Sequence, residues 1–271
     1  MTHIRVDRAG RIGTITIDRP ARFNSLDVET AQDFRRAGLQ LARDPETRVV
    51  VLRGLPNMFC SGADLKFIRD GGDASLAYLT KRGATGYGEC FKQILEYIHS
   101  TISEIRRAPK PFVAAVDGIA AAGGFGIAMS CDLVIASSRA SFEWAYGKTA
   151  LTGAESTTFF LPRLIGFRRA MELMLLNPRL TAERALEYGL VTSVHSVETF
   201  DAAVQSAAER IAAGPSHAFA VAKELLNQSA GMDRLDDHLD RELQELARAA
   251  DGDEVAEGIR AFFEKRDAHY A

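Results

Sequence analysis

Residues 120–135 read AAAGGFGIAMSCDLVI, a stretch in which three alanines and two adjacent glycines precede a third glycine and Asp132. The segment before it, PFVAAVDG at residues 111–118, is apolar and typical of a buried strand, and Leu133 to Ala136 predict another strand. The small residues between them predict a helix whose first turn leaves backbone N–H groups open to a ligand. This strand, helix and strand predict a layered α/β fold.

The segments before this stretch follow the same alternation. Gly13 to Asp18 alternate as a half-buried strand, and Val49 to Leu52 predict a second one. Residues 73–107 predict a helix, which Pro109 and Pro111 end. Its apolar face is formed by Phe91, Ile94, Leu95, Ile98, Ile102 and Ile105.

From Thr181 onward the helical pattern dominates. Leu235, Leu239, Leu243 and Leu246 form an apolar stripe. Such a stripe closes either on the core of its own chain or on a neighbouring subunit.

Composition narrows the class of protein. The chain has 271 residues, 46% hydrophobic and 25% charged, which favours one large domain with an appendage. A net charge of −3 and dispersed basic residues argue against a nucleic-acid partner. Cys60, Cys90 and Cys131 lack a CxxC or zinc spacing, so we expect reduced thiols in a cytoplasmic protein and no metal site. No apolar run is long enough for a membrane span.

A second turn of small residues lies in FCSGADLK, residues 59–66. If its helix start meets the one at Gly123, the N–H groups of Ala63 and Gly123 would hold one oxygen between them as an oxyanion hole. The alternative is that the glycines only permit tight packing of strand against helix.

Five phrases, in this order, resemble the enoyl-CoA hydratase/isomerase (crotonase) superfamily over nearly the whole chain. They are TITIDRPARFNSLD, FCSGADLK, KPFVAAVDGIAAAGGFGIAMSCDLVIA, FFLPRLIG and AFFEKR. The resemblance implies a spiral of ββα turns, which we assign to residues 1–195, and a helical C-terminal trimerisation region at 196–271. It further implies homotrimers or hexamers and acyl-CoA substrates, with coenzyme A as part of the substrate and no other cofactor. In the family, the amides that match Ala63 and Gly123 hold the thioester carbonyl and stabilise an enolate.

The resemblance also shows what this chain lacks. Hydratases of the family activate water with two glutamates, and Gly126 and Tyr146 stand at those positions. Hydration by the two-glutamate route is therefore not expected.

Three residues remain as catalytic candidates. Glu155 falls one residue after the position where family isomerases and 4-chlorobenzoyl-CoA dehalogenase have an aspartate, and this chain has Ala154 at that position. The alternative to a catalytic role is that Glu155 only caps the next helix. Tyr146 matches an aromatic residue of that dehalogenase, as a hydroxyl donor or, the interpretation we favour, as a pocket wall. His99 matches its histidine, as a general base or, more in keeping with its helix position, as a packed histidine.

Contacts with coenzyme A follow from the same resemblance. Arg22, Phe23 and Lys66 match positions along the pantetheine and nucleotide, and Phe262 with Lys265 matches a pair that reaches the nucleotide of an adjacent subunit. Each is otherwise a surface or packing residue.

Our first functional hypothesis is an isomerase or atypical hydratase in which Glu155 moves a proton beside a thioester enolate. The alternatives are a hydrolase or dehalogenase-like enzyme for an aromatic or bulky acyl-CoA, and an acyl-CoA binding protein without catalysis. The sequence does not identify the acyl group.

Overall fold

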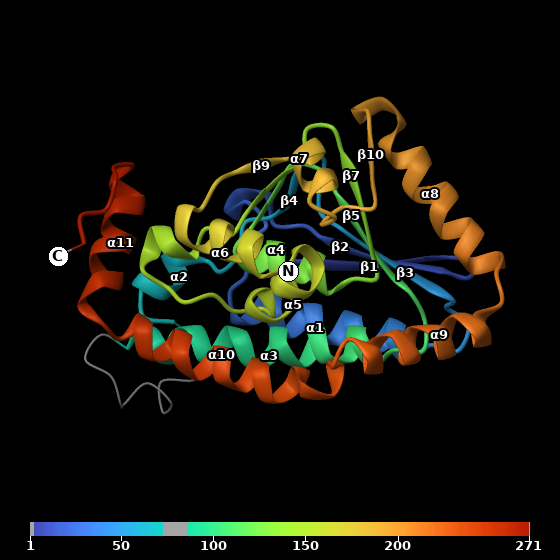
Figure 1. Cartoon of the computed structure of the whole chain (residues 1–271), viewed down its shortest axis with the longest axis horizontal. Helices are drawn as coiled ribbons and strands as arrows, with labels where there is room; N and C mark the ends of the chain where they lie inside the picture. Colours follow the sequence, from blue (N-terminus) through green and yellow to red (C-terminus); the bar gives the residue numbers. More distant parts are fainter. Residues whose placement is uncertain (1–2, 73–85, 271) are drawn as a thin grey trace.

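The computed structural model describes residues 3–72 and 86–270 and contains two sheets (Figure 1). The large sheet has six strands in the order β1-β2-β3-β5-β7-β10, of which only the β1–β2 pair is antiparallel. Its strands are β1 (Ile4–Ala9), β2 (Ile12–Ile17), β3 (Val49–Arg53), β5 (Phe112–Val116), β7 (Leu133–Ser137) and β10 (Ser193–His195). The small sheet has the order β4-β6-β8-β9, with strands β4 (Met58–Cys60), β6 (Ile119–Ala121), β8 (Ser141–Glu143) and β9 (Leu180–Thr181).

The chain visits both sheets in each turn of a spiral. The strand pairs β3 and β4, β5 and β6, and β7 and β8 each place one strand in the large sheet and the next in the small one. A helical segment then leads to the next turn. This arrangement is the predicted spiral of ββα turns.

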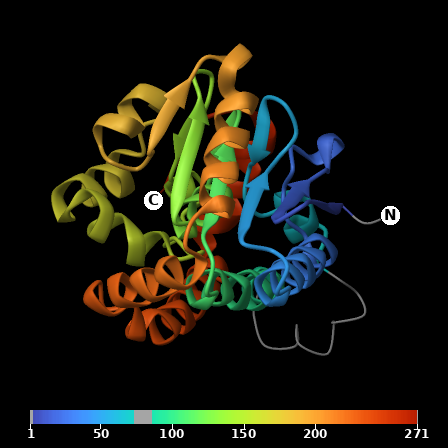
Figure 2. The same ribbon diagram turned by 90° about the vertical axis from the view of Figure 1, so that its right-hand side faces the viewer.

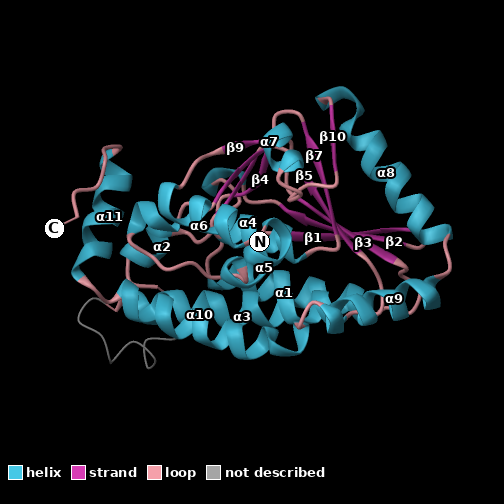
Figure 3. Ribbon diagram, viewed as in Figure 1, coloured by secondary structure: helices cyan, strands magenta, loops and turns pink. Residues whose placement is uncertain are grey.

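The helices surround these sheets, as Figure 3 shows in cyan. They are α1 (Val28–Arg43), α2 (Leu65–Arg69), α3 (Tyr87–Arg107), α4 (Gly123–Ser130), α5 (Thr157–Ile165), α6 (Phe167–Leu176), α7 (Ala182–Glu187), α8 (Val197–Ala213), α9 (Ser216–Ser229), α10 (Leu235–Ala250) and α11 (Asp253–Glu264). Short 3-10 helices are η1 (Pro20–Arg22), η3 (Tyr146–Thr149) and η4 (Met232–Arg234). Helices α1, α3 and α10 lie along one side of the molecule (Figure 1).

The large sheet is buried on both faces, because strand side chains alternate in direction. In β3, Val49 and Val51 pack in a cluster with Phe200 and Val204 of α8, whereas Val50 and Leu52 pack in the main core. Figure 2 shows α8, in orange, lying across that face of the sheet.

The predicted strands are confirmed with shifts of one or two residues at their ends. The helix predicted for residues 73–107 is confirmed from Tyr87 to Arg107, and its earlier part, 73–85, lies outside the described residues. The leucine stripe of α10 packs against α3 and joins the main core, so it closes on its own chain. The trimerisation role of this region and the division at residue 195 stay predictions.

Cys60, Cys90 and Cys131 are free and buried. Within the described ranges, no helix is long and apolar enough to cross a membrane.

Candidate active site

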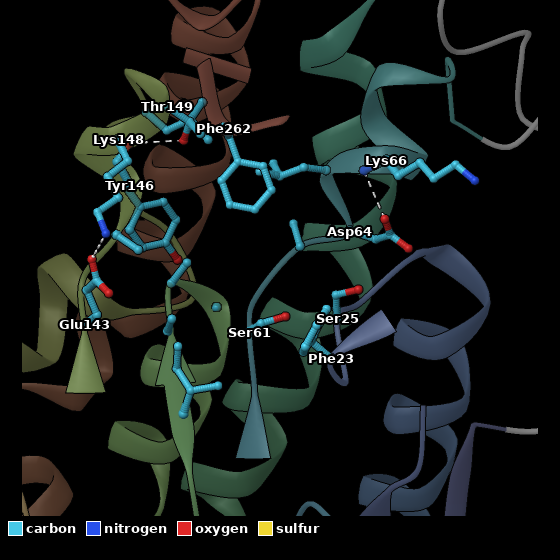
Figure 4. Close-up of a pocket in the computed structure, with 18 of the residues that line it drawn as sticks. Phe23, Ser25, Ser61, Asp64, Lys66, Glu143, Tyr146, Lys148, Thr149 and Phe262 are labelled. Atoms are coloured by element: carbon cyan, nitrogen blue, oxygen red, sulfur yellow. Dashed lines mark hydrogen bonds and ion pairs between the residues drawn. The ribbon is translucent and has the colours of Figure 1, made fainter. Parts of the chain in front are cut away.

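A cavity of about 420 Å³ opens where the two predicted turns meet (Figure 4). Its wall includes Ser61, Ala63 and Asp64 from the turn between β4 and α2, and Ala121 to Gly123 from the turn between β6 and α4. The 3-10 helix η3 contributes Tyr146, Lys148 and Thr149, and the C-terminal helices contribute Leu246, Phe262 and Phe263.

The first turn leaves the amide of Ala63 available. Ala63 forms a parallel bridge with Leu26, whose N–H donates to Gly62 at 2.8 Å and whose carbonyl accepts from the Asp64 amide at 2.9 Å. In a parallel bridge the flanking residues make both bonds, so the N–H of Ala63 itself is directed away from Leu26. Asp64 then caps α2 by accepting from the amides of Lys66 and Phe67.

The second turn packs tightly against the first. A Cβ on Gly124 would lie 2.1 Å from the Cys60 carbonyl oxygen, and one on Gly62 would lie 3.0 Å from the Gly123 nitrogen. Gly123 is the first residue of α4, where amides have no partner within the helix. The small residues therefore serve close packing, and the same packing brings Ala63 and Gly123 to one cavity.

Glu155 reaches this cavity from the loop before α5. Its side chain is 2% exposed, and its Oε1 would lie 2.6 Å from a Cβ on Gly123. A Cβ on Gly126 would lie 2.8 Å from the Cβ of Glu155. The nearest atom to that Cβ would be the Glu155 carbonyl oxygen, at 2.2 Å, so the backbone and Cβ of Glu155 fill the space of a side chain at position 126.

The surroundings of Glu155 favour a carboxyl group that exchanges protons near neutral pH. Burial raises the pKa of Glu155 to about 7, although the hydrogen bond from Tyr146 lowers it. The Tyr146 hydroxyl donates to Oε2 of Glu155, and its oxygen also lies 3.2 Å from the Ala154 carbonyl oxygen. Tyr146 is thus both a wall of the cavity and a donor to the carboxyl group.

His99 holds the backbone of Glu155. Its Nε2 accepts from the Glu155 amide at 3.1 Å, and burial lowers the pKa of the ring to about 4. The ring is therefore neutral at neutral pH. His99 does not line the cavity, and its assignment as a general base stays a prediction.

Two further carboxylates line the described part of the cavity, and both pair with cations. Asp64 binds Arg19 and Arg22; burial raises its pKa, but these and other hydrogen bonds outweigh burial and hold the pKa at about 2. Glu143 binds Lys148, and also Arg179 at 3.1 Å. Neither Glu143 nor its two partners was identified from the sequence.

Four of the five predicted coenzyme A contacts line the cavity. Phe23 and Phe262 are exposed at 66% and 54%, Lys66 is exposed, and Arg22 binds Asp64. Lys265 lies just beyond α11 and not on the cavity wall. Phe262 lines the cavity of its own chain, and its contact with the nucleotide of an adjacent subunit stays a prediction.

Over the described residues, no group of three or more His, Cys, Asp or Glu side chains is arranged to hold a metal ion.

Known proteins resemble this chain over almost its full length. A profile described as "Enoyl-CoA hydratase/isomerase" matches residues 7–271. 4-Chlorobenzoyl coenzyme A dehalogenase-2 of Arthrobacter sp is 30% identical, with coverage of 97% of this chain and 91% of the relative. 1,2-Epoxyphenylacetyl-CoA isomerase of Escherichia coli K12 is 33% identical, with 95% and 94% covered.

A solved structure agrees with these relatives. The crystal structure of an enoyl-CoA hydratase from Mycobacterium avium subsp. paratuberculosis K-10 superimposes with a TM-score of 0.87 at 30% identity, covering 100% of this chain and 99% of the other. Fold, sequence and cavity thus lead to one conclusion: this chain is an enzyme of the enoyl-CoA hydratase/isomerase family.

Proposed function

We propose that this enzyme is an acyl-CoA isomerase that moves a proton with a single carboxyl group, Glu155. One observation carries the proposal. Of the three carboxylates that line the described cavity, Asp64 and Glu143 pair with cations, whereas Glu155 binds the neutral Tyr146 hydroxyl.

The proposed reaction needs one base and one oxyanion hole. Ionised Glu155 takes a proton from a carbon next to the thioester carbonyl or further along the acyl chain, and the electron pair moves onto the carbonyl oxygen as an enolate. The amides of Ala63 and Gly123 stabilise that oxygen, each by about a hundredfold or more in rate. Protonated Glu155 then returns the proton to a different carbon, so that a double bond changes place and the atoms balance.

The pKa of Glu155 suits both halves of this transfer. A group with a pKa of about 7 is present in both protonation states near neutral pH, so it accepts and returns a proton with similar ease. Addition of water by two acids is less well supported, since Glu143 is bound by Lys148 and Arg179.

We propose an apolar acyl group and a coenzyme A moiety at the cavity mouth. Phe91, Leu151 and Leu246 offer an apolar wall to the acyl group. The proposed contacts of coenzyme A in the cavity wall are Arg22, Phe23, Lys66 and Phe262. Lys265 is also proposed to contact coenzyme A, although it does not line the cavity.

A second candidate, hydrolysis or dehalogenation of an aromatic acyl-CoA, is favoured by the similarity to 4-chlorobenzoyl coenzyme A dehalogenase-2. The contacts of His99 weigh against it, because its Nε2 already accepts from the Glu155 amide and is not free to activate water.

Glu155→Gln tests the proposal. In deuterated water, NMR measures exchange of the acyl protons next to the thioester carbonyl, and absorbance measures double-bond migration in 2-enoyl-CoA and 3-enoyl-CoA. We expect both rates to fall by about a hundredfold to ten-thousandfold, because Gln carries no exchangeable carboxyl proton. Binding of the same thioesters should change by less than about threefold, since the amides are intact.

Glu245→Gln is the control, because Glu245 is an exposed acid of α10 that pairs with Arg248. Wild-type exchange in Glu155→Gln would exclude Glu155 as the base. Release of free coenzyme A or halide in place of a rearranged thioester would establish the second candidate.

A further inference from the structure

A second buried acid, Glu242, lies behind the cavity wall. It stands on α10 and is 6% exposed, yet it does not line the cavity. Leu239 and Leu246, three residues before and four after it, lie on the same face of the helix and pack in the main core. A carboxylate in such surroundings is costly unless hydrogen bonds satisfy it.

The partners of Glu242 are the amides that follow Glu155. Its Oε2 accepts from the Ser156 amide at 2.8 Å, and its Oε1 accepts from the Thr158 amide at 3.0 Å and from the Thr158 hydroxyl. The Nε2 of His238 lies 3.6 Å from Oε1. Ser156, at the start of α5, makes no side-chain cap of its own, so a residue distant in sequence caps this helix.

The turn that Glu242 holds has an unusual backbone. Glu155 and Ser156 have φ angles of +50° and +64°, in the left-handed region that residues other than glycine rarely adopt. Two consecutive amides of this turn are bound by side chains, that of Glu155 by His99 of α3 and that of Ser156 by Glu242 of α10. Helices α3 and α10, which pack against each other, thus both bind the turn at Glu155 and Ser156.

We propose that Glu242 is a positioning residue: its carboxylate holds the left-handed turn that places the Glu155 carboxyl group beside Gly123. The inference rests on the proposed function, in which Glu155 is the group that moves the proton. Glu242 itself touches neither the cavity nor the substrate.

The charge of Glu242 adds a second effect. The groups that face Glu155 from the surrounding elements are Tyr146 of η3, Cys60 of β4, His99 of α3 and Glu242 of α10. Burial tends to raise the pKa of Glu242, but the nearby His238 and the hydrogen bonds that the carboxylate accepts outweigh burial and lower the pKa, so Glu242 is ionised at neutral pH. This negative charge raises the pKa of Glu155, after burial as the main cause.

Two variants separate position from charge. In Glu242→Gln, the amide keeps one acceptor for two backbone donors and loses the charge. We expect kcat to fall by about tenfold to a hundredfold, KM to change by less than about twofold, and the Glu155 carboxyl to titrate at lower pH. In Glu242→Asp, the charge stays while its reach shortens, so kcat should fall with little change in the titration midpoint. Glu245→Gln, on the exposed face of α10, should match the wild type.

Carbon-13 NMR of labelled glutamate carboxyl groups, with Glu155→Gln for assignment, measures that midpoint without any turnover. A folded Glu242→Gln with the wild-type kcat and midpoint would overturn the inference. So would a kcat loss that only follows the unfolded fraction in both variants. If Glu242→Gln does not fold, Glu242→Asp decides by kcat alone: a folded Glu242→Asp with the wild-type kcat would overturn the inference.

Failure of the proposed function has a different signature. Wild-type turnover in Glu155→Gln would remove Glu155 from the chemistry. The NMR midpoint of Glu155 in Glu242→Gln would still show whether Glu242 acts on this carboxyl group.

Discussion

At the scale of single residues, Glu155 combines burial, a neutral hydrogen-bond donor and a left-handed backbone. A residue other than glycine in that conformation costs about 1–2 kcal/mol, and Glu155 and Ser156 both adopt it. The bonds from their amides offset this cost. The Ser156 amide donates to the Glu242 carboxylate, and a hydrogen bond to a charged group contributes about 1.5–3 kcal/mol. The Glu155 amide donates to the neutral His99 ring, and such a bond contributes about 0.5–1.5 kcal/mol.

The raised pKa of Glu155 gives a prediction for stability. The folded chain holds the proton up to about pH 7, whereas the ordinary value for the unfolded chain is 4.5. Stability from this group is therefore fully present below the lower pKa and lost as pH rises through the upper one. The loss is about 3 kcal/mol at most, at 1.36 kcal/mol per pKa unit.

Glu155→Gln removes this dependence, because Gln does not ionise. Urea unfolding at about pH 5 and about pH 8 should show that the stability of the variant relative to the wild type increases with pH. If the difference in stability between Glu155→Gln and the wild type is the same at both pH values, the pKa of Glu155 is not raised in the folded chain.

At the scale of elements, two helix starts carry the proposed oxyanion hole. Helix α4 begins at Gly123 and α2 at Leu65, and the turn before each lies against the other. Their approach depends on Gly124, where a Cβ would lie 2.1 Å from a backbone oxygen that cannot rotate away.

Gly124→Ala should therefore separate the two turns. We expect a loss of stability of about 1–3 kcal/mol from overpacking and a fall in kcat/KM of about a hundredfold or more from the displaced donors. Urea unfolding and steady-state kinetics measure the two effects. Gly147→Ala is the control, since its Cβ would meet Trp144 at an ordinary 3.5 Å. Equal kinetics of the two variants would contradict a role for the contact between the turns.

At the scale of the whole molecule, the spiral brings distant parts of the chain to one cavity. Ala63, Gly123 and Glu155 come from successive turns of the spiral, and Phe262 comes from the C-terminal helices. Because α10 carries Glu242 and Leu246, the C-terminal region contributes to the site as well as to the core.

Several large apolar side chains are exposed on α6 and α9. Phe167, Leu175 and Leu176 on α6 are 71%, 73% and 76% exposed, and Leu225 and Leu226 on α9 are 60% and 70% exposed. Exposed apolar side chains are candidates for subunit contacts. The family resemblance implies a trimer or a hexamer, so we expect sedimentation velocity to give three or six times the chain mass of 29.6 kDa. A single species of one chain mass at micromolar concentration would contradict the trimer and the hexamer.

Local sequence patterns were sufficient for four strands of the large sheet, for the helix that ends at Arg107 and for the two turns. The alternation in Gly13 to Asp18, the apolar run before Gly123 and the prolines after Arg107 each act within a few residues, so they are legible without the fold. The resemblance then gave the spiral. The leucine stripe of α10 could pack either on the core of its own chain or on a neighbouring subunit, because periodicity shows which face of a helix is apolar but not what covers it.

The tertiary structure alone decided what surrounds each functional side chain. The sequence nominated Glu155, Tyr146 and His99, but only the fold shows that His99 binds the Glu155 amide and that Glu155 fills the space beside Gly126. The sequence indicates Glu242 only as a charged residue on the apolar face of α10. Its partners Ser156 and Thr158 are 86 and 84 residues away in the sequence. The pKa of a carboxyl group depends on burial and on neighbours from several elements, and these are set only when the chain has packed.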